Sequence, residues 1–284
     1  PSLLAINAGD VNVFDELGRT PLHAAARHAS PELLRALLAA DAPIDLNAGD
    51  GDGMPPLMLA AIHGRVSNVN TLLRAGAAHD AVHAPTGRTA AHFAAQHAPP
   101  LRVLRALAAG GANIDARTQR DGATALSEAV AQPSQHRNRR VRELINIGAS
   151  CNAPTASGDT PLHIALQQRA LDVIPLLIDH GADVNAANSQ RSTPLHVIAQ
   201  HPDHGATIAA QHLLHAGADI TACDMFGVTP REVAKVHRST AIVKLIDGVF
   251  TNDVGDRRRS RTFGFAGLGN DDDDGGGGGG GDDD

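Results

Sequence analysis

Thr160-Pro161-Leu162-His163 is a stretch that this chain repeats without change at Thr20-Pro21-Leu22-His23 and at Thr193-Pro194-Leu195-His196. Weaker copies of the same motif begin at Pro55, Thr89, Thr124 and Thr229. The first residues of the seven copies lie 35, 34, 35, 36, 33 and 36 positions apart. A nearly fixed period of this length predicts a row of similar structural units that bury their apolar faces against one another.

The residues around each motif predict two short helices joined by turns. Thr is a good N-cap and Pro a good first helical residue, so each motif begins a helix. A second helix in each unit carries paired leucines such as Leu176-Leu177, and in several units it ends at Gly-Ala. Glycine stands two residues before most motifs, where a tight turn requires a positive φ. These are Gly18, Gly53, Gly87, Gly122, Gly158 and Gly227, whereas the sixth unit has Arg191, which predicts a strained or altered turn.

This pattern resembles the ankyrin-repeat family over about residues 1–248, because Thr-Pro-Leu-His-x-Ala at a period of about 33 residues is the signature of that family. The resemblance implies an all-α solenoid of stacked helix-turn-helix units with β-turn fingers. Residues 1–14 read as a partial N-terminal unit, and 15–250 as seven repeats. We number the repeats as units one to seven: 15–48, 49–83, 84–118, 119–154, 155–187, 188–223 and 224–250. Residues 251–284 are expected to form a disordered Asp/Gly-rich tail.

Composition limits the function classes. Hydrophobic residues make up 42% and aromatic residues 2%, so the core must be packed from Ala, Leu, Val and Ile. The net charge is -7, of which residues 251–284 carry -5, so the nearly neutral body does not predict nucleic-acid binding. No apolar run is long enough to span a membrane. Two widely spaced cysteines, Cys151 and Cys223, favour a reducing cytoplasmic location, with the nucleus as an alternative.

The resemblance implies that a protein partner lies against the turn tips and the inner helices, the first helix of each unit. Eight residues after each motif begins, five of the seven units have His and two have Gln. Two interpretations of this column remain open: helix capping, and a partner-contacting stripe that gains charge below about pH 6.5. A metal site is disfavoured, because neighbouring units lie about 10 Å apart. The predicted contact residues are Glu16, Leu17, Arg19, Arg27, His28, Ile62, His63, Arg88, Gln96, His97, Gln168, Gln200, His201, Met225 and Phe226.

The motif histidines have a different predicted role. In the family, this side chain makes a hydrogen bond to the backbone between neighbouring turns. The resemblance therefore implies a structural role for His23, His92, His163 and His196.

Two departures from the repeat are candidate functional segments. The connection between the helices is longer in units four and six, over Gln132–Val141 and Gln200–Thr207. The first of these is predicted as a basic loop that either binds an acidic segment or is only a solvated surface; its arginines are Arg137, Arg139, Arg140 and Arg142. The basic run 257–261 in the tail is either a targeting or phosphorylation motif or a plain linker.

The sequence gives little support for catalysis. It has no GxxxxGK[ST], HExxH or GxSxG motif, and nearly every His is explained by its place in a repeat. We therefore expect no catalytic residue, cofactor or metal, and a monomer. The predicted function is a non-catalytic scaffold or adaptor that binds a protein on the concave groove. The alternative is a regulatory or targeting module cut from a larger enzyme or channel, and a catalyst in its own right is the third hypothesis.

Overall fold

The computed structural model describes residues 12–28, 30–40, 43–96 and 101–249. The described residues up to Val243 belong to one compact unit, and a second begins at Lys244, of which residues 244–249 are described and helical. Most of the predicted partial unit at 1–14 and the whole predicted tail at 251–284 lie outside the described residues, so both stay predictions.

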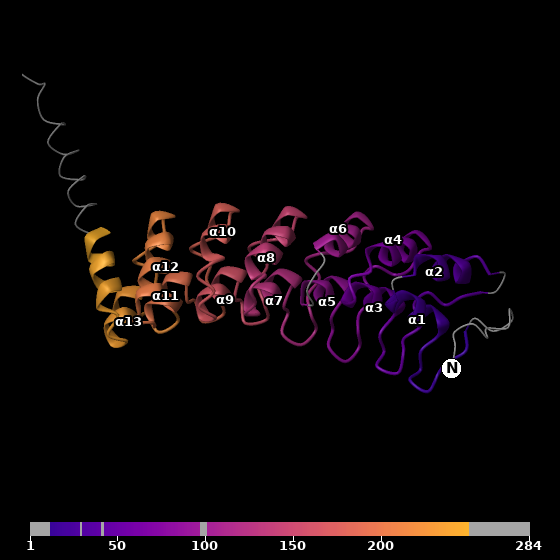
Figure 1. The fold of residues 1–284 in the computed structure, drawn as a ribbon. Coiled ribbons are helices and arrows are strands. Elements are labelled where there is room, and N and C mark those ends of the chain that lie inside the picture. Colours follow the sequence, from indigo (N-terminus) through magenta and orange to yellow (C-terminus); the bar gives the residue numbers. More distant parts are fainter. Residues whose placement is uncertain (1–11, 29, 41–42, 97–100, 250–284) are drawn as a thin grey trace, which may run out of the picture. The chain divides into compact units, whose positions relative to one another are not determined.

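The first compact unit is a row of helix pairs, and its described residues contain no β-strand (Figure 1). The all-α fold predicted from the motif is therefore confirmed. The inner helices are α1 (Pro21–Arg27), α3 (Pro56–Ile62), α5 (Ala90–Gln96), α7 (Ala125–Ala131), α9 (Pro161–Gln167), α11 (Pro194–Ala199) and α13 (Pro230–Val236). The outer helices are α2 (Pro31–Leu38), α4 (Val66–Arg74), α6 (Leu101–Ala109), α8 (Arg137–Asn146), α10 (Ile174–Asp179) and α12 (His204–His215). Each inner helix packs against the inner helix of the next unit.

The motif residues start the inner helices as the sequence predicts. Thr160 has extended backbone angles (φ -78°, ψ 166°), and Pro161 is the first helical residue, where its missing N–H is not needed. The backbone N–H of Thr160 donates to Nδ1 of His163 at 3.2 Å, so the third helical residue caps its own helix.

The core is aliphatic and lies between the inner and outer helices. Leu22, Leu126, Leu162 and Leu195 occupy the same motif position and are at most 1% exposed. Alanines such as Ala25 are fully buried as well, and these small side chains let successive helices approach closely. The low aromatic content is thus compatible with a continuous core.

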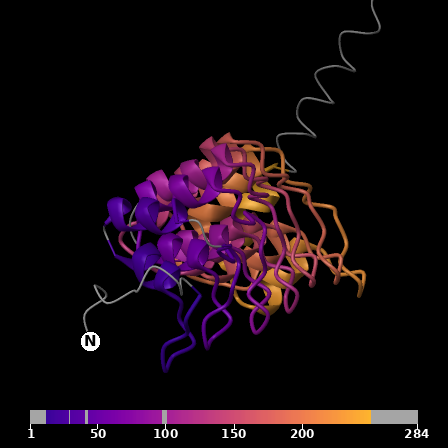
Figure 2. The same cartoon turned by 90° about the vertical axis from the view of Figure 1, so that its right-hand side faces the viewer.

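The turns before the inner helices project to one side of the stack (Figure 2) and are linked to one another by backbone hydrogen bonds. The donors are the N–H groups of Gly51, Ala156, Ser189 and Met225, and the acceptors are the carbonyls of Leu17, Asp121, Ser157 and Gln190, at 2.8–2.9 Å. The turn of unit six keeps the backbone conformation of the others, because Arg191 adopts a φ of 57°, in the left-handed region that its glycine counterparts occupy. The turn is therefore strained by its non-glycine residue but is not altered in conformation.

The motif histidines bridge neighbouring units, which confirms their expected structural role. Nε2 of each imidazole faces the carbonyl immediately before the motif of the next unit. The pairs are His23 with Met54, His92 with Ala123, His163 with Ser192 and His196 with Val228, at 3.0–3.1 Å. Because Nδ1 accepts a backbone N–H, Nε2 carries the proton and donates to this carbonyl. Each bridge therefore uses the neutral imidazole.

Candidate partner-binding face

Three register positions of each unit define one face of the stack. Counted from the first residue of a motif, the fourth, seventh and eighth following residues line hollows at two separate places. They are Ala24, Arg27 and His28 in unit one, and Glu128, Ala131 and Gln132 in unit four. We call the surface formed by these positions and by the turns before the inner helices the groove face.

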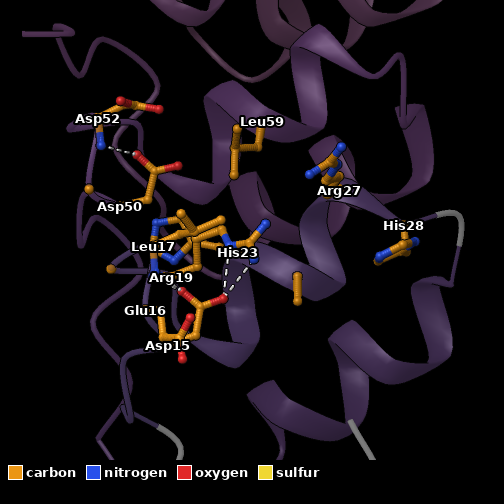
Figure 3. A pocket seen from close by; sticks show the side chains of 13 residues that line it. Asp15, Glu16, Leu17, Arg19, His23, Arg27, His28, Asp50, Asp52 and Leu59 are labelled. Atoms are coloured by element: carbon orange, nitrogen blue, oxygen red, sulfur yellow. Dashed lines mark hydrogen bonds and ion pairs between the residues drawn. The ribbon is translucent and has the colours of Figure 1, made fainter. Parts of the chain in front are cut away.

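The N-terminal hollow lies between the turns and inner helices of units one and two and has a volume of about 870 Å³. Figure 3 shows Arg27 and His28 on the helix side and Asp50 and Asp52 on the turn side. Leu17 lines the same hollow and is 60% exposed, so it offers an apolar contact there. The predicted contact residues that the structure brings together here are Glu16, Leu17, Arg19, Arg27 and His28.

Asp15 fixes the conformation of this first turn. Its carboxylate accepts hydrogen bonds from the backbone N–H of Leu17 and from both the backbone and the side chain of Arg19, at 2.8–2.9 Å. The Arg19 guanidinium holds the pKa of Asp15 below its usual value. Arg19 is therefore both a predicted contact residue and part of the turn that presents Leu17.

The His/Gln column lies at the ends of the inner helices. The C-cap residues that directly follow these helices, each of which donates its backbone N–H to the last turn, include His28, His63, Gln132, Gln168 and His237. The side chains of His28, His63, Gln168 and His237 are exposed, whereas His201 is half-buried. Gln200 is exposed and Ile62 half-buried beside this column, and His97 lies outside the described residues.

Arg88 is held within the groove face instead of pointing freely from a turn tip. Its Nε donates to Oε1 of Glu128 at 2.9 Å, and its Nη1 donates to Oε1 of Gln96 at 3.3 Å. Two predicted contact residues, Arg88 and Gln96, thus lie together. The third member of the cluster, Glu128, was not predicted from the sequence, although one signal marks it: the fourth residue after the motif start is apolar in every other unit.

The prediction that the arginines of unit four lie in a basic loop is wrong. Arg137, Arg139, Arg140 and Arg142 lie in α8, and the Arg140 side chain is buried. Its Nη1 donates to the carbonyls of Ala95 and Gln96 at 2.9 Å, at the end of α5 in the preceding unit. Arg140 is therefore a structural cation that satisfies helix-end carbonyls, not a free charge for an acidic partner.

Two further units use the same device. Nδ2 of Asn68 in α4 donates to the carbonyls of Ala25, Ala26 and His28 at 2.7–3.0 Å. The hydroxyl of Ser239 donates to the carbonyl of Ala199 at the end of α11. If the His/Gln column served as helix caps, its side chains would bond to the carbonyls at these helix ends. Side chains of the outer helix or C-terminal part of a later unit already donate to those carbonyls. The column side chains therefore have less to cap there.

The turn of unit seven presents two exposed apolar side chains. Met225 is 54% and Phe226 76% exposed, although the backbone of this turn is well anchored through Met225 N–H and Gln190 O at 2.9 Å. A rigid backbone with exposed Met and Phe side chains is typical of an interface anchor. Both residues were predicted as contact residues, and their exposure is compatible with that prediction.

The described residues contain no group of three or more His, Cys, Asp and Glu placed to hold a metal ion. Within the same ranges, no helix combines the length and apolar character needed to cross a bilayer.

Comparisons with known proteins fit the geometry. The family profile described as ankyrin repeats (3 copies) matches residues 2–83 and 131–224. The mouse B-cell lymphoma 3 protein homolog is 33% identical over 174 residues, which are 61% of this chain and 38% of that protein. Mouse NF-kappa-B inhibitor delta is 28% identical over 185 residues, 57% of this chain and 56% of that protein. The Arabidopsis thaliana E3 ubiquitin-protein ligase KEG is 30% identical over 242 residues, 81% of this chain and 14% of the ligase.

The solved ankyrin repeat domain of Bcl-3 superposes with a TM-score of 0.71 at 31% identity, covering 81% of this chain and all of that one. The chain spans well under two thirds of the length of the curated relatives it matches. The fold, the bridging histidines and the profile match over most of the repeats all agree, and the chain belongs to the ankyrin-repeat family.

Proposed function

We propose that this chain is a non-catalytic interaction module that, as a monomer in the cytoplasm or the nucleus, holds a protein partner on its groove face. The observation that carries the proposal is the N-terminal hollow of about 870 Å³, lined by Glu16, Leu17, Arg19, Arg27 and His28. Of these, Glu16, Leu17, Arg27 and His28 are exposed. Side chains on the groove face can vary without altering the fold, because stacking depends on other positions.

The character of the groove supports a protein as the ligand. It combines exposed apolar anchors, Leu17 and Phe226, with charged side chains such as Arg27, which is the composition of interface centres and their surroundings. The relatives add support, because one of them is named as an inhibitor of NF-kappa-B. An open groove also lacks the enclosure from water that most catalytic sites require.

The test compares two triple variants as baits in native lysate. The groove variant carries Leu17→Ala, Arg27→Ala and Phe226→Ala. The matched control carries Glu32→Ala, Arg35→Ala and Arg142→Ala, which change exposed side chains of the outer helices. We expect wild type and control to capture the same proteins. The groove variant should capture at least tenfold less of them, because a few apolar and Arg side chains dominate binding at most interfaces. Equal capture by both variants, with unchanged circular dichroism, overturns the proposal.

A second candidate is a targeting module within a larger enzyme. The match to the E3 ubiquitin-protein ligase favours it, because most of this chain aligns with a small part of a much longer catalytic protein. An antibody raised against the repeats decides between the two candidates. A native protein far larger than 284 residues supports the module, and one of that size supports the stand-alone adaptor.

A further inference from the structure

Unit four departs from its neighbours at two adjacent positions of the inner helix. The third residue after the motif start is Ser127, where units one, three, five and six have the bridging histidine. The fourth is Glu128, the one carboxylate in an otherwise apolar column. The other members of this column are Ala24, Leu59, Phe93, Ile164, Val197 and Val233.

Ser127 still caps its own helix, but its short side chain does not make the hydrogen bond to the next unit. Its Oγ accepts the backbone N–H of Thr124 at 2.8 Å, as Nδ1 of the imidazole does elsewhere. The hydroxyl then donates to the carbonyl of Thr124 at 2.9 Å, within its own unit. Ser127 also lines a hollow of about 260 Å³ between α7 and the turn of unit five. We call it the unit-four pocket; its polar lining is Arg88, Asp121, Ser127, Glu128, Gln132 and Thr155.

Glu128 brings an incompletely bonded carboxylate to this pocket. It is 9% exposed, and its Oε1 accepts the hydrogen bond from Arg88. Its Oε2 is buried and has no hydrogen-bond donor among the described residues. A buried carboxylate oxygen without a donor is unfavourable, so this atom gains from any N–H group that enters the pocket.

The charges that line the pocket favour a cation. Arg88 contributes one positive charge, and Asp121 and Glu128 contribute two negative charges. The hydroxyl of Thr118 donates to Asp121 and lowers the pKa of that carboxyl, which keeps Asp121 ionised at neutral pH. The lining therefore carries a net negative charge that Arg88 alone does not neutralise.

We propose that the unit-four pocket receives a cationic side chain, arginine or lysine, of the protein partner, which donates to Oε2 of Glu128. This inference rests on the proposed function and names the chemistry of one contact within it. The pocket, at about 260 Å³, suits the end of a single side chain, because small-molecule sites are usually larger. The terminal torsion of a Glu side chain has a broad minimum, so the carboxylate can turn Oε2 towards the cation while Arg88 stays bonded to Gln96.

The test uses short peptides and the isotope-labelled chain. The probes are acetylated, amidated pentapeptides Gly-Gly-X-Gly-Gly in which X is arginine, lysine or the neutral arginine analogue citrulline. We expect the arginine or the lysine peptide to shift the backbone NMR signals of residues 121–132 with a millimolar Kd. Citrulline should bind at least tenfold more weakly, because it keeps the shape and loses the charge. The stronger of the two cationic peptides identifies the preferred side chain.

Two variants assign the effect to Glu128. Glu128→Gln should weaken binding of the cationic peptide at least tenfold, whereas the control Glu32→Gln, which changes an exposed carboxylate of the outer helix α2, should change the Kd less than twofold. If Glu128→Gln fails to fold, Glu128→Leu restores the apolar column and should lose the binding while keeping the native spectrum. The inference is overturned if no peptide shifts residues 121–132, if citrulline binds as well as arginine, or if the folded Glu128 variants bind normally.

The capture experiment separates this inference from the proposed function. If Glu128→Gln captures the same lysate proteins as wild type while the groove variant does not, the proposed function stands and the unit-four pocket is excluded. If the groove variant also captures normally, the proposed function itself fails, whatever the peptides do.

Discussion

Units four and five are linked to the unit that follows them by different hydrogen bonds. In unit five, His163 caps its own helix and donates to the carbonyl of Ser192 in the next unit at 3.0 Å. In unit four, Ser127 caps its helix only, and the link to unit five through the turns is the backbone bond from Ala156 to Asp121 at 2.8 Å. One junction is therefore linked by a buried side chain as well as by the turns, whereas the turns of the other are linked by backbone alone.

This difference shows that a repeat protein can change the residue at one register position without changing its fold. The bridging imidazole contributes stability and fills the space between two turns. Where serine replaces it, the side-chain hydrogen bond between units is lost, and Ser127 lines the unit-four pocket. If the unit-four pocket binds as proposed, stability and binding depend on different copies of one register position.

Lowering the pH should have the largest effect on stability, because it acts on several histidine bridges together. Burial lowers the pKa of His23, His92 and His163, so the native state holds these imidazoles neutral. The unfolded chain binds protons near pH 6.5, so the bridges contribute fully above that pH and lose their contribution as pH falls below it. We expect the urea midpoint to fall steadily from pH 7 to pH 5.

The control for the acid effect is the variant His163→Gln, which should show a shallower decline over the same range. Native carboxylates with lowered pKa values, such as Asp121, lose their contribution only below about pH 4, so they do not account for the change. A midpoint that is constant from pH 7 to pH 5 contradicts the bridge mechanism.

Substitution of single residues tests the two junctions directly. His163→Ala should lower the free energy of unfolding by about 3 kcal/mol, because it leaves a cavity and an unsatisfied carbonyl on Ser192. Ser127→Ala should cost about 1 kcal/mol, because it removes only a helix cap. Urea titrations followed by circular dichroism compare them. Similar losses would mean that the bridge between units adds nothing beyond the cap.

Two arginines of α8 allow a comparison of a buried side chain that caps α5 with an exposed one. Arg140→Ala should destabilise the chain by about 2 kcal/mol, because the carbonyls of Ala95 and Gln96 lose their buried donor. Arg142→Ala changes an exposed side chain of the same helix and should cost less than about 0.5 kcal/mol. Hydrogen exchange of the α5 amides locates the effect. If the two variants are equally stable, Arg140 does not act as a cap.

The sequence predicts the fold of this chain well because each signal is local and recurs. A Thr cap, a Pro in the first turn and a glycine with positive φ act within a few residues, and the motif presents them at a regular spacing. The start of α8 was missed because local rules disfavour it: His136 is the N-cap, and arginines oppose the helix dipole in the first turn. That turn is stabilised by distant partners, through Arg140 and through the ion pair of Arg137 with Asp172 at 3.0 Å.

The candidate site was predicted only in part for the same reason. The turn-tip and helix-end positions follow from the repeat register, so the sequence alone places Leu17, Arg27 and His28 among the candidate residues. Glu128 was missed because its partner, Arg88, lies 40 residues away. Its signal was a break in an apolar column, which becomes visible only when the units are compared position by position.

The smallest expected effect concerns the turns of units five and six. Arg191 has a φ of 57°, which costs an L-residue about 1 kcal/mol relative to glycine, so Arg191→Gly should raise the free energy of unfolding by roughly 0.5–1 kcal/mol. The reciprocal change, Gly158→Ala, should destabilise, because φ is 79° there and the added Cβ would lie 2.7 Å from the backbone nitrogen of Ser189. Paired urea titrations measure both changes. Opposite signs would mean that the backbone conformation, which the units share, decides which residue suits this turn. A loss of stability in Arg191→Gly would instead show that the arginine side chain stabilises unit six, and would make that turn, like unit four, a place where one copy has departed from the repeat for a reason of its own.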